Sequence, residues 1–166
     1  DNFLPSLPAM AQYFSVHSSA IRFTIPVYML GLCMSQLVYG PISDYTGRKP
    51  IVVIGLLVFT VGSILATLAP SLPVLLSARL IQGLGIGATS ALFRVILRDC
   101  FEGVELAKVG SYMSIAFAIV PPLAPITGGY IGTYFGWRSN FLICVLLAIV
   151  VLMILLVFLP ETHHPD

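Results

Sequence analysis

The chain has 166 residues, of which 58% are hydrophobic and 9% are charged, with a formal net charge of +1. Soluble domains contain roughly 45–50% apolar and about 25% charged residues, so this composition excludes a water-soluble domain. The few charges lie in short clusters and not along a stripe, which also excludes a nucleic-acid-binding surface.

Long uncharged runs predict an all-α, polytopic membrane protein. Each run reaches or exceeds the ~20 residues that a membrane-spanning helix needs. The runs cover residues 23–43, 51–77, 109–137 and 139–160. With the charged and proline-containing turns between them, they predict helices at about residues 1–14, 21–42, 50–68, 74–97, 109–134 and 139–159.

We expect one transmembrane bundle over residues 1–166, with an incomplete first helix. The chain starts at Asp1 without an initiator Met or a signal peptide and stops soon after an apolar run. We therefore interpret it as a piece of a longer protein.

The distribution of Lys and Arg predicts the orientation of the bundle. One set of connections carries Arg48, Lys49, Arg98 and Lys108, and the alternate set carries Arg22 and Arg138. Cytoplasmic connections hold the excess of positive residues, so the loop at residues 43–50 is predicted to be cytoplasmic. Trp137 and Tyr134 would then lie at the outer interface, where aromatic residues gather.

Residues 40–50 form the densest group of charge and glycine in the chain. The glycines permit a tight turn. Asp44 can accept hydrogen bonds from the N-terminus of a helix that follows in the rest of the protein. Arg48 and Lys49 supply donors for carboxylates. An alternative is that these two cations only set the membrane topology.

The pattern Gly40-x-x-Ser43-Asp44-x-x-Gly47-Arg48-Lys49 resembles the signature loop of the major facilitator superfamily. The resemblance implies that this chain is the amino-terminal, six-helix half of a twelve-helix transporter. It also implies that the loop is a cytoplasmic latch between the halves, made in one access state and broken in the other. The candidate latch residues are Gly40, Asp44, Gly47, Arg48, Lys49, Arg98 and Asp99.

The fourth predicted span contains an arginine, Arg79, about five residues inside its outer end. An ionised group inside a span is costly, which favours a functional role. Helical spacing places Arg79, Gln82, Gly83, Gly87 and Ser90 on one face, where the glycines permit close packing. The alternative is an arginine that reaches outward to the membrane interface.

The run Arg79-x-x-Gln82-Gly83-x-Gly85 resembles the motif that proton-coupled members of the superfamily carry at this place. The resemblance implies that Arg79 takes part in proton coupling. Asp1 is the candidate proton carrier. Desolvation favours its neutral form, whereas a nearby cation favours its ionised form, so its protonation can change with the access state. The alternative is that Asp1 is an exposed, capped carboxylate.

The fifth predicted span contains a group of prolines followed by two glycines. Pro121, Pro122 and Pro125 each delete a backbone hydrogen bond, and Gly128, Gly132 and Gly136 recur at every fourth residue. This pattern predicts a bent helix with one close-packed face. The stretch around Gly128 and Gly129 resembles the antiporter motif of the superfamily, with Ala124 in place of its first glycine. A simple packing kink is the alternative.

Four further segments resemble the bicyclomycin-resistance (Bcr/CflA) type of drug and proton antiporter. They are residues 1–8, residues 36–41, Arg94-x-x-x-Arg98-Asp99 and Gly136-Trp137-Arg138-x-x-Phe141. Pro26 departs from the usual second helix of that branch. The resemblance implies a multi-pass protein of the bacterial inner membrane.

We therefore predict a secondary active transporter that exports drugs or amphipathic metabolites by proton-coupled antiport. Its expected partners are a small-molecule substrate, protons, the lipid bilayer and a carboxy-terminal six-helix half. Residue type and depth suggest a substrate cavity lined by Tyr28, Met29, Ser35, Gln36, Gln82, Tyr112 and Met113. The alternatives are an uptake carrier for a nutrient or osmolyte, and a membrane scaffold or receptor without transport.

An enzyme is not expected, because no catalytic set of Ser, His and acid, no carboxylate pair and no metal cluster lies at one membrane depth. The three cysteines, Cys33, Cys100 and Cys144, have no metal-binding or redox spacing. The glycines of residues 83–87 lie in an apolar span with no preceding strand, which argues against a nucleotide loop. We expect no cofactor.

Overall fold

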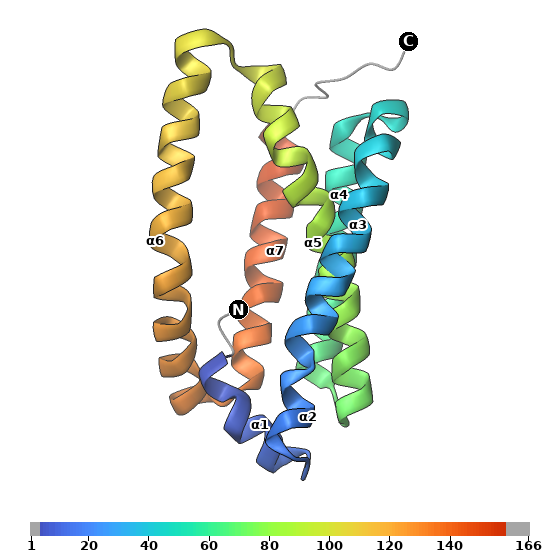
Figure 1. The fold of residues 1–166 in the computed structure, drawn as a ribbon, viewed down its shortest axis with the longest axis vertical. Helices are drawn as coiled ribbons and strands as arrows, with labels where there is room; N and C mark the ends of the chain where they lie inside the picture. The colour runs from blue at the N-terminus through green and yellow to red at the C-terminus, as the bar shows by residue number, and fades with distance from the viewer. Residues whose placement is uncertain (1–3, 159–166) are drawn as a thin grey trace.

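The computed structural model describes residues 4–158, except for the side chains of Asp44 and Phe158 (Figure 1). The described residues form helices and no strand. In chain order they are the 3-10 helix η1 (Leu4–Ser6) and the α-helices α1 (Leu7–Tyr13), α2 (Ser18–Arg22), α3 (Thr24–Thr46), α4 (Arg48–Leu68), α5 (Leu72–Cys100), α6 (Gly103–Phe135) and α7 (Arg138–Phe158).

Five helical stretches of the described chain are long and apolar enough to cross a membrane. They are α2 with most of α3, then α4, α5, α6 and most of α7. Figure 1 shows them standing side by side along the long axis of the molecule, with η1 and α1 at one end. The prediction of an all-α, polytopic membrane protein is confirmed.

The first charged turn consists of one residue, Gly47. Helix α3 continues to Thr46, beyond its predicted end near residue 42, and α4 starts at Arg48. Gly47 has φ 90° and ψ 159°, and its N–H donates to the carbonyl of Ser43 at 3.1 Å. Only glycine adopts this backbone conformation at low cost. The turn is therefore sharper than the sequence pattern suggested.

The second charged connection is also shorter than predicted. Helix α5 ends at Cys100 and α6 begins at Gly103, so that only Phe101 and Glu102 separate the two helices. The sequence predicted that the first of these helices ends near residue 97 and that the next one begins near residue 109. Charged side chains can reach water while the backbone remains helical, so the loss of apolar character marks the membrane surface and not the end of the helix.

Helix α5 lies between α3 and α4 and packs closely against both. The close approach depends on two glycines. A Cβ atom at Gly83 would overlap the backbone of Tyr28 in α3, and one at Gly85 would overlap the backbone of Phe59 in α4. Small residues at helix interfaces allow backbones to approach in this way inside a membrane. Helix α5 is therefore the helix on which both α3 and α4 pack.

The end of the bundle opposite Gly47 has an aromatic core. Trp137 is only 7% exposed and packs edge-on to Tyr13, at 5.7 Å between ring centroids, and to Phe141, at 6.2 Å. The guanidinium of Arg138 lies 4.5 Å from the centre of the Trp137 ring. These groups cover the indole, so Trp137 packs inside the protein, whereas Tyr134 is exposed; the place of both at the outer membrane interface stays a prediction.

Helix α6 stands apart from the other helices along most of its length (Figure 1, left). Gly128 is its only buried residue, and its contacts are mainly with η1 and α7. Its outward side chains are mostly large and apolar, including Phe117, Ile126 and Phe135. The sides of α6 that the described residues leave uncovered are suited to lipid or to another helix.

Candidate functional site

Arg79 lies inside the bundle, in the first half of α5. Its side chain is 4% exposed and contacts α3. Its Nη1 donates to Oε1 of Gln82 at 2.8 Å, and its Nε donates to the carbonyl of Thr24 at 3.4 Å. The ring of Tyr28 lies 4.2 Å from the guanidinium carbon, in cation–π geometry. Arg79 therefore faces inward and does not reach the membrane interface.

Gln82 connects Arg79 to α4. Its Nε2 donates to Oγ of Ser63 at 2.7 Å, and that hydroxyl donates to the carbonyl of Phe59 at 2.8 Å. Both Gln82 and Ser63 are fully buried. These hydrogen bonds fix the amide so that its oxygen accepts from the guanidinium of Arg79.

The other predicted member of the proton-coupling pair, Asp1, lies outside the described residues. Its role and that of Arg79 remain predictions.

At the Gly47 end, Arg48 and Asp99 form an ion pair that joins the start of α4 to the end of α5. The Arg48 side chain is 11% exposed and the Asp99 side chain 26%, so the pair is partly shielded from water and less sensitive to salt than a fully exposed pair. The Nζ of Lys49 donates to the carbonyl of Leu156 in α7 at 3.5 Å. Arg48 and Lys49 thus contact other helices of this bundle.

Two of the remaining latch candidates lie apart from this pair. Arg98 is exposed, and a Cβ atom at Gly40 would meet no described atom within 4 Å. The side chain of Asp44 lies outside the part of the chain that the structure describes. The latch therefore remains a prediction.

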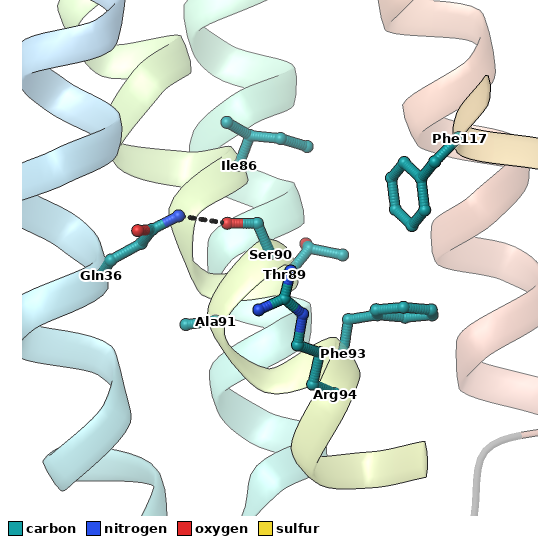
Figure 2. A pocket seen from close by; sticks show the side chains of 8 residues that line it. All are labelled: Gln36, Ile86, Thr89, Ser90, Ala91, Phe93, Arg94 and Phe117. Atoms are coloured by element: carbon teal, nitrogen blue, oxygen red, sulfur yellow. Dashed lines mark hydrogen bonds between the residues drawn. The ribbon is translucent and has the colours of Figure 1, made fainter. Parts of the chain in front are cut away.

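A pocket of about 760 Å³ opens between α3, α5 and α6 (Figure 2). Gln36 is the one residue of the suggested cavity that lines it, and its Nε2 donates to Oγ of Ser90 at 2.7 Å. Phe93 of α5 and Phe117 of α6 meet across it, with ring centroids 6.1 Å apart. Its lining consists of Gln36, Ile86, Thr89, Ser90, Ala91, Phe93, Arg94 and Phe117.

The other residues suggested for the cavity lie elsewhere. Ser35 is buried between α3 and α5, where its hydroxyl donates to the carbonyl of Leu32 at 2.9 Å. Tyr28 and Gln82 belong to the Arg79 cluster. Met29 and Tyr112 are exposed, and Met113 is half-buried on α6.

Helix α6 contacts η1 and α7 at the end nearest Trp137. Asn140 of α7 is 2% exposed, and its Nδ2 donates to Oγ of Ser6 and to the carbonyl of Gly128, both at 3.2 Å. Gly129 faces Pro5 of η1. Gly132 faces the Ser6 side chain. Three of the glycines predicted to pack, Gly128, Gly129 and Gly132, therefore lie at this contact.

The rest of the α6 motif lies differently. Gly136 is not on the packed face, because it forms the turn into α7 with φ 83°. Pro121 and Pro122 are exposed and Pro125 is half-buried, and all three lie within one continuous helix. Gly87 of α5, the other predicted packing glycine, faces the Ser35 side chain.

Sequence reasoning missed Ser63, Asn140 and the structural role of Arg138. Arg138 donates from Nε to the carbonyl of Thr67 at 3.0 Å and from Nη2 to that of Ala69 at 3.1 Å. It therefore caps the end of α4 from the start of α7. Its partners are 71 and 69 positions away, and no local pattern signals such a contact.

The five membrane-spanning stretches, with a buried cation between them, define a helical, polytopic membrane protein. The sequence matches the Major Facilitator Superfamily over residues 1–166, and the chain belongs to this family. The predicted family is confirmed, and it is a family of membrane transporters and not of enzymes.

Named relatives support the predicted branch. The chain is 32% identical over 164 residues to Multidrug resistance protein D of Escherichia coli, covering 99% of this chain and 42% of that protein. It is 32% identical over 166 residues to a Bicyclomycin resistance protein homolog of Haemophilus influenzae, covering 100% and 42%. Multidrug resistance protein MdtL of Escherichia coli is 33% identical over 163 residues, covering 98% and 42%. The chain thus spans about two fifths of the length of these relatives.

Proposed function

We propose that the chain is the amino-terminal half of a secondary active transporter that exports drugs or amphipathic metabolites in exchange for protons. The observation that carries this proposal is Arg79, a cation buried within a membrane-spanning helix and held by Gln82. A charge at that depth costs a few kcal/mol or more, so a functional role is the best explanation for it. The relatives named for multidrug and bicyclomycin resistance support drugs as the substrate class.

In this mechanism Asp1 carries the proton. Protonation from the outer side favours release of the bound substrate and the return of the carrier to the inward-facing state. Substrate from the cytoplasm then displaces the proton. Arg79 stabilises the ionised carboxylate, since a nearby cation favours the charged form.

The ion pair of Arg48 and Asp99 supports a latch at the Gly47 end. It fixes α4 to α5 within this half, so the two helices can move as one body. Asp44 is then the group that engages the second half of the transporter in one access state. We place this end on the cytoplasmic side of a bacterial inner membrane, because it carries the larger share of Lys and Arg.

Transport in membrane vesicles tests the proposal with the full-length protein. An imposed pH gradient is expected to drive substrate into inside-out vesicles, and Asp1→Asn should reduce this uptake at least tenfold. Exchange of labelled for unlabelled substrate at equal pH should persist in Asp1→Asn, because exchange moves no net proton. Arg22→Gln, which removes an exposed cation from α2, is the matched control and should transport normally.

Unchanged pH-driven transport in Asp1→Asn would remove Asp1 as the proton carrier. Substrate movement in the opposite direction, into right-side-out vesicles, would indicate an uptake carrier of the same fold.

A further inference from the structure

We infer that the pocket around Arg94 selects amphipathic anions, molecules with an aromatic body and a carboxylate or a similar acidic group. This inference rests on the proposed transport function and names the substrate class of the pocket between α3, α5 and α6. It concerns Arg94, which the sequence patterns did not assign to a cavity.

The pocket contains a cation without a matching acid. Arg94 lines the pocket, and no carboxylate is among the other lining residues. Among the side chains that the structure describes, no ion pair is found for Arg94, while Asp99, the acid nearest to it in sequence, is paired with Arg48. Figure 2 shows the Arg94 side chain directed back along α5 toward Thr89 and Ser90. An anionic ligand would supply the missing partner, because guanidinium binds carboxylates through parallel hydrogen bonds.

Polar groups beside Arg94 can orient such a ligand. Oγ1 of Thr89 is buried and has no hydrogen-bond partner among the described residues. Gln36 and Ser90 hydrogen-bond to each other at the pocket wall, which leaves the Gln36 oxygen and the second Nε2 hydrogen for a ligand. A buried polar group without a partner is uncommon, so the Thr89 hydroxyl supports a site that a ligand completes.

The aromatic pair provides the apolar part of the site. Phe93 and Phe117 approach each other edge to face from α5 and α6, and Ile86 extends the apolar wall. Rings in this arrangement offer both a face and an edge to an aromatic ligand. The volume of about 760 Å³ lies in the range of roughly 300–1,000 Å³ that small-molecule sites occupy. A cationic ligand of the same shape would be repelled by Arg94.

Three naphthalene compounds of similar size test the inference: 1-naphthaleneacetate, 1-naphthaleneacetamide and 1-naphthaleneethylammonium. Binding is measured by calorimetry on the full-length protein in detergent at pH 7.5. We expect the carboxylate to bind at least tenfold more tightly than the ammonium compound. Arg94→Gln should weaken carboxylate binding at least tenfold and change amide binding by no more than about twofold. Retained binding of the neutral amide shows that the pocket of the variant is intact.

Lys108→Gln is the matched control, since it removes an exposed cation that does not line the pocket. All three affinities should stay unchanged in it. The inference is overturned if the ammonium compound binds as tightly as the carboxylate, or if no probe binds. It is also overturned if Arg94→Gln weakens all probes equally, or if Lys108→Gln reproduces its effect.

These outcomes are separate from those of the vesicle test. Proton-driven export of cations would leave the proposed function intact and remove the anion preference. Anion binding that depends on Arg94, without pH-driven transport, would keep the site and remove the proposed function.

Discussion

Ser63 is the residue through which α4 supports the buried arginine of α5. Its hydroxyl is the only acceptor that the described residues provide for Nε2 of Gln82. Polar groups at such positions restrict the orientation of their neighbours, because an alternative rotamer would leave a buried donor or acceptor unsatisfied. Helical spacing predicted the inward direction of Arg79, but it could not predict that a serine 19 positions from Gln82 would fix the amide.

Replacing Ser63 by Ala is expected to lower the free energy of unfolding by about 1–3 kcal/mol, since it leaves the amide of Gln82 without its acceptor. The measurement is thermal or denaturant-induced unfolding in detergent. Ser77→Ala is the control, because the Ser77 hydroxyl is exposed and bonds only to the carbonyl of Pro73 in its own helix. Equal stability of the two variants would contradict the role of Ser63.

The turn between α3 and α4 is the element whose geometry depends most on one glycine. A change of Gly47 to Ala places a side chain at φ 90°, and we expect a loss of about 1–3 kcal/mol of stability. Gly110→Ala is the control, since a Cβ atom there would meet no described atom within 4 Å and alanine favours the helix. Unfolding midpoints of the two variants provide the comparison. A Gly47→Ala protein as stable as the parent would show that the turn can relax.

The elements themselves follow from the sequence more closely than their ends do. Uncharged runs of sufficient length identify the membrane-spanning helices, because the bilayer fixes the length that must be apolar. The turns are harder to predict from the sequence, because a helix can continue past the membrane surface through charged residues, as α5 does through Asp99. The pocket lay beyond prediction because Gln36 and Ser90 are 54 positions apart and meet only once α3 has packed on α5.

At the scale of the whole molecule, the orientation in the membrane can be tested with two single cysteines in a background without Cys33, Cys100 and Cys144. Tyr45→Cys lies near the Gly47 turn, where Tyr45 is 80% exposed, and Pro70→Cys lies in the exposed turn between α4 and α5. A membrane-impermeant maleimide should label Pro70→Cys on intact cells. It should label Tyr45→Cys only after permeabilisation. Labelling of Tyr45→Cys on intact cells would reverse the orientation.

The uncompensated charge of Arg94 has an electrical consequence for the proposed exporter. With an empty pocket, this site contributes one positive charge, and a bound monovalent anion neutralises it. Moving one charge across the whole membrane is worth about 2.3 kcal/mol per 100 mV. For this proposed exporter we expect a potential that is negative inside to act on the empty carrier through Arg94 and to favour its inward-facing state. The return of the empty carrier is then expected to depend on voltage at this site, and the step that carries the anion outward is not.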